Sequence, residues 1–129
     1  WRHWERVGLT YDSTMTYADH EGFRCGTCHP FRPFDLEQNR ELNLWELPLV
    51  VMDGTLQQYR GLTPEQGEVR ILELARRCQQ VEGMFTLLWH NSSLHGEWAP
   101  WAEMYRRVVR VLAGMQADRC PRQAQDPVQ

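Results

Sequence analysis

Two apolar runs, separated by one helix-like segment, constrain the fold of this chain more than any other feature. Residues 47–53 and 84–90 are apolar almost throughout, and each run ends in an ionisable side chain, Asp53 in the first and His90 in the second. Runs of this length without polar alternation are typical of strands that are buried on both faces of a parallel sheet. The sequence therefore predicts two central parallel strands whose carboxyl ends carry Asp53 and His90.

The segment between the two runs predicts a crossover helix. Thr63 is a good N-cap, Pro64 suits the first helical position, and Gln66 stands where its amide completes a capping box. Gly83 marks the point where the helix has ended. The core face of this helix is expected to contain six side chains: Val69, Leu72, Ala75, Ile71, Leu74 and Cys78.

The rest of the chain predicts shorter elements around this unit. In chain order they are a helical segment over residues 1–8, a strand over 9–15, a long loop over 16–33, a hairpin of 34–37 with 42–46, and a last helix over 97–117. The core face of the last helix is expected to be Trp101, Met104, Tyr105, Val108, Val109, Leu112 and Met115. This order predicts an α/β fold, a partial (β/α) barrel-like parallel sheet with flanking helices and one β-hairpin.

Composition bounds the domain and its partners. The 129 residues, 42% of them hydrophobic and 24% charged, suit one domain over residues 1–117, followed by a flexible tail over 118–129. A net charge of −3 argues against nucleic acid as a partner. No run approaches the roughly 20 apolar residues of a membrane span, so no membrane partner and a cytoplasmic location are expected. The four cysteines are expected to be free thiols.

The long loop contains the densest group of reactive side chains, Cys25-x-x-Cys28-His29. This spacing is typical of the covalent attachment of haem c. Half of a zinc site, a redox dithiol, or cysteines that merely pack in an irregular loop are open alternatives. If a metal binds here, its ligands are Cys25, Cys28 and His29, and zinc rather than haem c is the expected occupant.

Three chemically active side chains, Arg24, Asp53 and His90, fall at predicted strand ends. Ligand sites of α/β sheets and barrels lie beyond the carboxyl ends of the strands. A carboxylate beside an imidazole fixes its tautomer and favours its charged form, so Asp53 and His90 can form a general acid. Each residue also has an ordinary explanation, such as a turn cap, a surface ion pair or a buried imidazole. We expect Asp53 and His90 to lie within hydrogen-bond reach, and Arg24 to open onto the same cavity.

Several segments resemble one known family. They are Tyr11-Asp12-Ser13-Thr14, Gly22-Phe23-Arg24-Cys25-Gly26-Thr27 with Pro30-Phe31, Leu49-Val50-Val51-Met52-Asp53, and Leu87-Leu88-Trp89-His90-Asn91. Together they resemble the C-terminal half of the catalytic barrel of a polysaccharide deacetylase of carbohydrate esterase family four. The resemblance implies a distorted (β/α) barrel, a carbohydrate substrate, and a divalent metal, usually zinc, that assists removal of acetyl groups from N-acetyl sugars.

The resemblance also implies roles for single residues. Arg24 would orient the catalytic base, Asp53 would hold His90, and His90 would protonate the leaving group. Leu88 would line the acetyl pocket. The residues expected to bind substrate are Leu88, Trp89 and Phe31.

The chain departs from the family at the metal site. The family's ligands come from an Asp-Asp motif and a His-x-x-x-His motif, and neither motif occurs in this sequence. We therefore expect a deacetylase-like hydrolase domain that is impaired alone. The alternative function is a non-catalytic metal- or haem-binding module that uses the Cys25-x-x-Cys28-His29 loop. Half a barrel leaves sheet edges open, so a homodimer or a missing N-terminal half is the expected partner.

Overall fold

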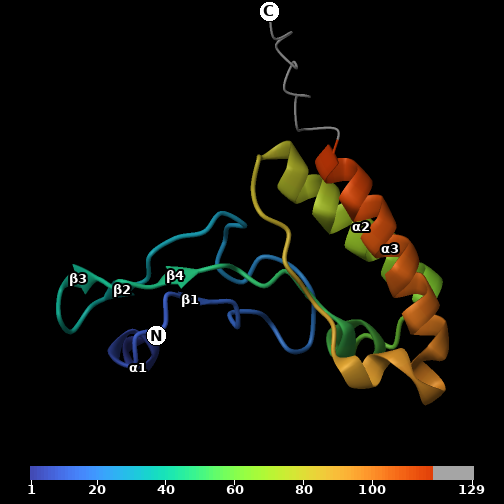
Figure 1. Cartoon of the computed structure of the whole chain (residues 1–129), viewed down its shortest axis with the longest axis horizontal. Helices are drawn as coiled ribbons and strands as arrows, with labels where there is room; N and C mark the ends of the chain where they lie inside the picture. The colour runs from blue at the N-terminus through green and yellow to red at the C-terminus, as the bar shows by residue number, and fades with distance from the viewer. Residues whose placement is uncertain (118–129) are drawn as a thin grey trace, which may run out of the picture.

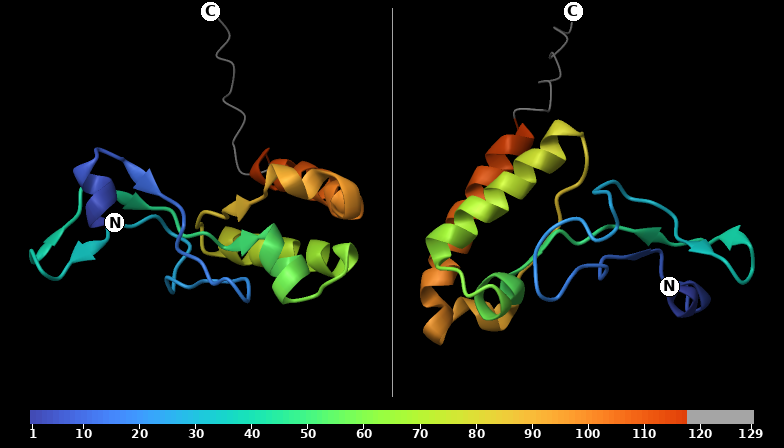
Figure 2. Two further views of the ribbon diagram at one scale, coloured as in Figure 1. Left: turned by 90° about the horizontal axis from the view of Figure 1, so that it is seen from below. Right: turned by 180° about the vertical axis from the view of Figure 1, so that it is seen from behind.

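The computed structural model describes residues 1–117, and the flexible tail predicted over 118–129 lies outside these residues. An N-terminal part with α1 (Arg2–Arg6) and four short strands extends away from two long helices, α2 (Pro64–Gln80) and α3 (Ala99–Ala117) (Figure 1). Figure 2 shows the same arrangement from below and from behind. The strands of the described residues form three two-stranded sheets and close no barrel. The fold is mixed α/β, and the barrel-like part of the prediction is not confirmed.

Two parallel strand pairs share one stretch of the chain, residues 45–52, which contains β4 and β5. β1 (Tyr11–Asp12) pairs with β4 (Trp45–Glu46), and β6 (Leu87–Leu88) pairs with β5 (Val51–Met52). The parallel pairing expected for the two apolar runs is therefore confirmed, although the regular strands are much shorter than the runs. The predicted central position is wrong, because β5 and β6 form a sheet of two strands and no residue of 84–90 is fully buried. Pro48, which has no N–H to donate, lies between β4 and β5, where the pairing partner changes from β1 to β6.

The hairpin forms in a different register from the one predicted. β2 (Phe34–Asp35) pairs antiparallel with β3 (Arg40–Glu41), not with residues 42–46. The Asp35 carboxylate accepts hydrogen bonds from the backbone N–H groups two and three residues further on, at 2.9 and 3.3 Å, and Asn39 adopts a positive φ of 50°. These contacts close the turn earlier than expected. The prediction of 42–46 as the second hairpin strand is wrong, because part of that segment forms β4.

The start of α2 follows the predicted capping box. The Gln66 backbone N–H donates to Thr63 Oγ1 at 3.3 Å, and the Thr63 N–H donates to Gln66 Oε1 at 2.9 Å. The buried face differs from the prediction in one respect, because Val69 is 68% exposed. A Cβ added to Gly67 would lie 2.7 Å from the Trp101 ring, so the missing side chain lets α3 approach α2 closely. The buried residues of α2 are Gly67, Ile71, Leu74, Ala75 and Cys78.

The second long helix, α3, packs against α2 along a narrow stripe. Trp101, Met104 and Val108 are buried, as predicted, whereas Val109 is 42% exposed and was wrongly assigned to the core. Val109 lies about 100° around the helix from Val108, beyond the reach of α2. In the described part of the chain, none of the helices has the length and apolar character that a membrane crossing requires.

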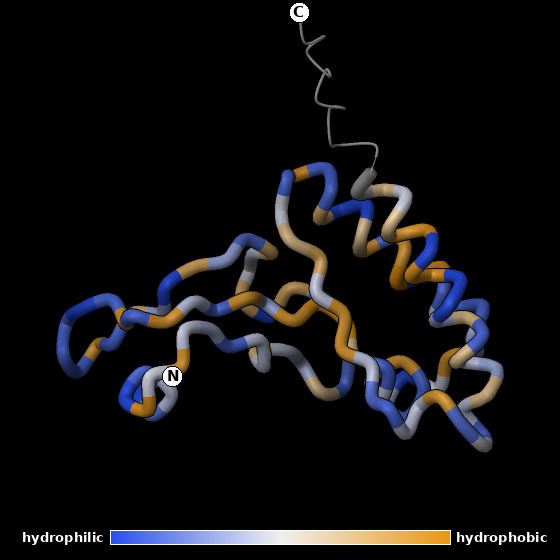
Figure 3. The backbone as a smooth tube through the Cα atoms, viewed as in Figure 1, coloured by the Kyte–Doolittle hydropathy of each residue, from blue (hydrophilic) through white to orange (hydrophobic). Residues whose placement is uncertain are grey.

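Three short helical segments connect these elements, and the sequence did not predict them. They are η1 (Thr55–Tyr59), a π-helix directly after β5, and the 3₁₀ segments η2 (Asn91–Leu94) and η3 (Gly96–Trp98) between β6 and α3. The core lies between the β5–β6 pair and the two long helices. Figure 3 shows apolar segments of the tube entering this region from the N-terminal part.

Candidate functional site

Asp53 and His90 meet at the carboxyl ends of the paired strands β5 and β6. His90 Nδ1 and Asp53 Oδ1 are 2.7 Å apart, and the His90 backbone N–H donates to Asp53 Oδ2 at 2.9 Å. The predicted hydrogen-bond contact is therefore confirmed. The Asp53 side chain is fully buried, whereas 51% of the His90 side chain is exposed. The imidazole is thus held on one side by a buried carboxylate and remains half open to solvent.

The surroundings of Asp53 keep its carboxyl group ionised. Besides the two contacts from His90, the Gly54 backbone N–H donates to Asp53 Oδ1 at 2.7 Å. Burial raises the pKa of the Asp53 carboxyl, but the hydrogen bonds from Ser93, His90 and Gly54 outweigh burial and hold the pKa below its usual value. A charged carboxylate at Nδ1 favours the tautomer with its proton on Nδ1, which leaves Nε2 for proton exchange with a ligand.

Arg24 lies on a loop that reaches the same end of β5. Its guanidinium donates at 2.6 Å to the carbonyl oxygen eight residues before it, and it lies 5.8 Å from the centroid of the Tyr17 ring. The Thr55 hydroxyl donates to the carbonyl oxygen of Ala18 in this loop at 3.0 Å. Since Thr55 follows Asp53 by two residues, the loop contacts the chain next to Asp53. The contacts of Arg24 do not include Asp53 itself, so a shared cavity stays a prediction.

The three residues predicted to bind substrate have different surroundings. Leu88 ends β6 and is 38% exposed, two residues before the histidine. Trp89 points toward α3, because its ring stacks on Tyr105 with a centroid distance of 4.6 Å. Phe31 meets the Trp1 ring edge-on at 6.5 Å and forms a backbone bridge to β4. Of the three, Leu88 has the surroundings that a substrate contact at the strand ends requires.

The Cys25-x-x-Cys28-His29 segment, called the cysteine loop below, does not form a group of metal ligands. Cys28 is 4% exposed and its thiol contacts that of Cys78, whereas His29 is exposed. Cys25 has a different neighbour, Glu46. Burial raises the pKa of the Cys25 thiol, and the nearby Glu46 carboxyl raises it further. In residues 1–117 no group of three or more His, Cys, Asp or Glu side chains could hold a metal ion. The structure therefore does not bring Cys25, Cys28 and His29 together as the zinc ligands that the spacing suggested.

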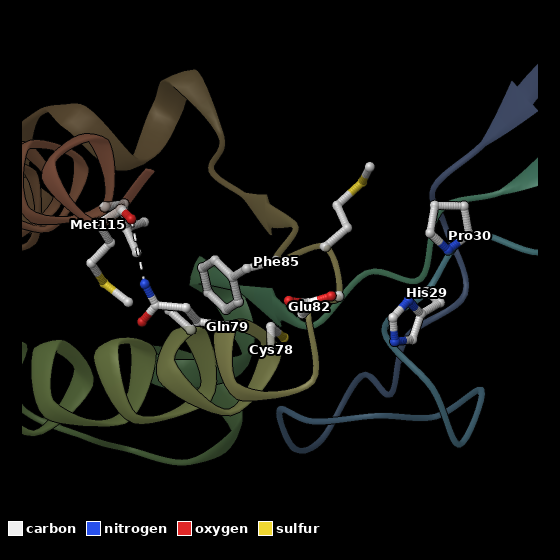
Figure 4. A pocket seen from close by; sticks show the side chains of 11 residues that line it. His29, Pro30, Cys78, Gln79, Glu82, Phe85 and Met115 are labelled. Carbon is white, nitrogen blue, oxygen red and sulfur yellow. Dashed lines mark hydrogen bonds between the residues drawn. The ribbon is translucent and has the colours of Figure 1, made fainter. Parts of the chain in front are cut away.

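A hollow of about 500 Å³ lies between the C-terminal ends of α2 and α3 and the cysteine loop (Figure 4). Cys78, Phe85 and Met115 contribute apolar surface to it, and His29 lines its side nearest the loop. Neither Asp53 nor His90 lines this hollow. The apolar hollow is therefore separate from the pair that carries proton-transfer chemistry.

A second buried acidic pair, which the sequence did not predict, links β1 to β4. Asp12 and Glu46 are register partners, 8% and 0% exposed, and Trp1 Nε1 donates to both carboxylates, at 3.3 and 2.8 Å. Burial, with the adjacent Asp12 carboxyl, raises the pKa of Glu46 to about 7. Glu46 Oε1 has no hydrogen-bond partner in the described residues, so a charge on this buried oxygen is not stabilised there. The signal in the sequence was the alternation of Leu42, Leu44 and Glu46, all of which are buried.

Comparison of the chain with known protein families, with curated proteins and with solved structures finds no match. The geometry of Asp53 and His90 and the motifs around them are therefore the basis for assigning a function.

Proposed function

We propose that this chain is the C-terminal half of a deacetylase-like hydrolase that removes acetyl groups from N-acetyl sugars. The observation that carries the proposal is the 2.7 Å contact between His90 and a fully buried Asp53 at the ends of two paired parallel strands. The two parallel strand pairs would then belong to a (β/α) barrel that other strands complete. Asp53 and His90 have the residue types, the places at strand ends and the order in the chain that the resemblance to carbohydrate esterase family four implies.

The pair suits the proton transfer that amide hydrolysis requires. Water must add to the acetyl carbonyl carbon, and the bond from that carbon to the sugar nitrogen then breaks to release acetate. The departing nitrogen must gain a proton, and a half-exposed imidazole can supply it. Asp53 stabilises the imidazolium before the transfer because its carboxylate is charged and hydrogen-bonded to Nδ1. Arg24 belongs to the loop that contacts the chain beside Asp53, and from there it would orient the catalytic base. No residue of the described chain is assigned as that base.

The divalent metal that the resemblance implies does not fit the side chains present. Residues 1–117 offer no group of three His, Cys, Asp or Glu side chains for it, and zinc sites of hydrolases use about three protein ligands. No step of the reaction is therefore assigned to a metal. What this chain contributes is the acid His90, its partner Asp53, and the apolar Leu88 beside them.

A binding experiment tests the proposal without requiring turnover. N-acetylglucosamine oligomers should shift the backbone amide NMR signals of Leu88 and His90 in a saturable way, and glucosamine oligomers should do so less, because the acetyl group is missing. His90→Ala should weaken binding several-fold, while His95→Ala, an exposed histidine five residues along the chain, should not. An absence of shifts up to about 10 mM oligomer, which would detect a Kd near 1 mM, would reject the proposal.

The alternative of a haem- or metal-binding module gains no support from the cysteine loop. Covalent attachment of haem needs both thiols at one accessible surface, and the Cys28 thiol lies in the core against Cys78. A visible absorption spectrum with elemental analysis of the purified chain would separate the two functions. A haem band, or one zinc per chain that Cys25→Ser removes, would favour the module.

A further inference from the structure

Glu21 is a buried carboxylate on the loop that carries Arg24. Its side chain is 0% exposed, and its Oε1 accepts a hydrogen bond from Arg70 Nε of α2 at 2.6 Å. Its Oε2 has no hydrogen-bond partner in residues 1–117 and lies 3.7 Å from a guanidinium nitrogen of Arg60, which directly follows η1. Arg70 is itself held by Glu73, one turn further along α2, at 2.9 Å. The carboxylate therefore ties the loop to two elements, α2 and the end of η1.

Two further contacts place the same loop alongside residues 50–55, which contain β5 and the start of η1. The Gly22 N–H donates to the Val50 carbonyl at 2.9 Å, and the Ala18 carbonyl accepts from the Thr55 hydroxyl at 3.0 Å. The loop therefore runs beside the carboxyl end of β5, and the buried carboxylate belongs to the stretch between the two contacts. An ion pair that fixes this carboxylate also fixes the approach of the loop to the strand end.

We infer that Glu21 is a positioning residue for Arg24, acting through its buried ion pair with Arg70. The inference rests on the proposed function for its catalytic meaning, because Arg24 orients a base only in that function. A buried ion pair adds little net stability compared with well-packed apolar side chains, so what it contributes here is one fixed geometry. Phe23 also packs against the core, but an apolar contact has no direction, whereas a guanidinium orients the carboxylate that it holds.

Amide hydrogen exchange of the full chain, followed by NMR, tests whether the ion pair holds the loop. Arg70→Gln removes the charge that faces Glu21, so the Gly22 amide hydrogen should exchange about tenfold faster, or more, through local opening of the loop. The Leu47 amide, which donates to the Asp12 carbonyl at 2.8 Å beside the β1–β4 pair, should exchange at its usual rate. This reference amide separates a local effect from a loss of overall stability.

The matched control is Arg107→Gln. Arg107 of α3 forms an ion pair of the same length, 2.6 Å, with Glu68 of α2, and this pair does not involve the loop. The control variant should leave the exchange of the Gly22 amide unchanged.

The NMR signals of the Arg24 side chain report on the residue that is positioned. Its guanidinium lies 5.8 Å from the centroid of the Tyr17 ring, so the ring shifts the signals of the nearby side-chain protons. Arg70→Gln should move these signals toward their ordinary arginine positions, and Arg107→Gln should not. Arg70→Lys, which keeps the charge but loses the planar guanidinium, should restore the signals in part.

A second variant covers the case in which Arg70→Gln does not fold. Glu21→Gln removes the charge from the carboxyl side but keeps a carbonyl that accepts from Arg70, so it should produce smaller changes in the same direction. Unchanged Gly22 exchange and unchanged Arg24 signals in the folded charge-removing variants, or equal changes in Arg107→Gln, would overturn the inference. If both change but acetylated sugars do not bind to the natural chain, the proposed function fails while Glu21 still positions the loop.

Discussion

Replacing Glu46 by glutamine should stabilise the folded chain at pH 8 and change its stability little at pH 5. Glu46 is 0% exposed, faces Asp12 across the β1–β4 pair, and has one carboxyl oxygen without a donor in the described residues. Two adjacent buried carboxylates cannot both ionise at low cost. The amide of glutamine has the shape of the protonated acid, can donate to Asp12, and never ionises.

The magnitude follows from the pKa of Glu46, which rises from 4.5 to about 7 on folding. Between these values the folded chain keeps a proton that the unfolded chain has lost, so the free energy of unfolding falls as the pH rises through this window. The contribution of the protonated Glu46 to the free energy of unfolding is fully present below pH 4.5 and is lost above about pH 7. At about 1.4 kcal/mol per pKa unit, the loss is about 3 kcal/mol. The lowered pKa of Asp53 acts in the opposite direction, and only in acid, below its ordinary value of 3.8.

Urea unfolding followed by tryptophan fluorescence at pH 5, 6, 7 and 8 measures this contribution. The natural chain should lose about 3 kcal/mol between pH 5 and pH 8, and the Glu46→Gln variant should lose much less. Glu41→Gln, which removes an exposed carboxylate from β3, should follow the natural chain. If the natural chain is equally stable at pH 5 and pH 8, or if Glu46→Gln shows the same fall, the folded chain does not raise the pKa of Glu46.

Three further predictions concern packing, catalysis and assembly. Gly83→Ala should destabilise the chain by about 1–3 kcal/mol in urea unfolding, because its Cβ would lie 2.2 Å from the Cys28 sulfur, and a second change, Cys28→Ala, should recover much of the loss. With added zinc, the chain alone should hydrolyse N-acetylglucosamine oligomers far more slowly than about 1 per second, and a faster rate abolished by His90→Ala would contradict this. Light scattering should find a dimer, because the two-stranded sheets of the described residues leave strand edges unpaired, and a monodisperse monomer at high micromolar concentration would count against it.

Local chemistry made parts of the fold predictable. The capping box of α2 involves only Thr63 and Gln66, so the sequence contains everything that decides it. The buried face of the same helix depends on where α3 lies, and that position depends on the fit of Trp101 over Gly67. Val69 belonged to an acceptable helical stripe but lies on the side that α3 does not cover. Periodicity therefore predicted the helix and could not select between neighbouring faces.

The candidate site was predictable to a similar extent. Asp53 and His90 were found because each ends an apolar run, and parallel strands bring such ends together. The burial of Ser93 gave no comparable signal, because it arises from a 3₁₀ turn that the sequence pattern does not show. The cysteine spacing suggested one cluster, but Cys28 packs against Cys78, a residue fifty positions later that no local motif connects to it.

The segment from Glu46 to Asp53 has a buried carboxyl group at each end, and the two groups differ in charge because they have different neighbours. Burial and the facing Asp12 carboxyl favour the neutral form of Glu46 and raise its pKa to about 7, although hydrogen bonds from Trp1 and from the Met15 backbone act in the opposite direction. Asp53 receives hydrogen bonds from Ser93, His90 and Gly54, so the charged form is favoured in spite of full burial. Only a carboxylate that stays charged near neutral pH can stabilise an imidazolium. The neighbouring carboxyl group therefore explains why the acid chemistry is assigned to the β5–β6 end of this segment and not to its β1–β4 end.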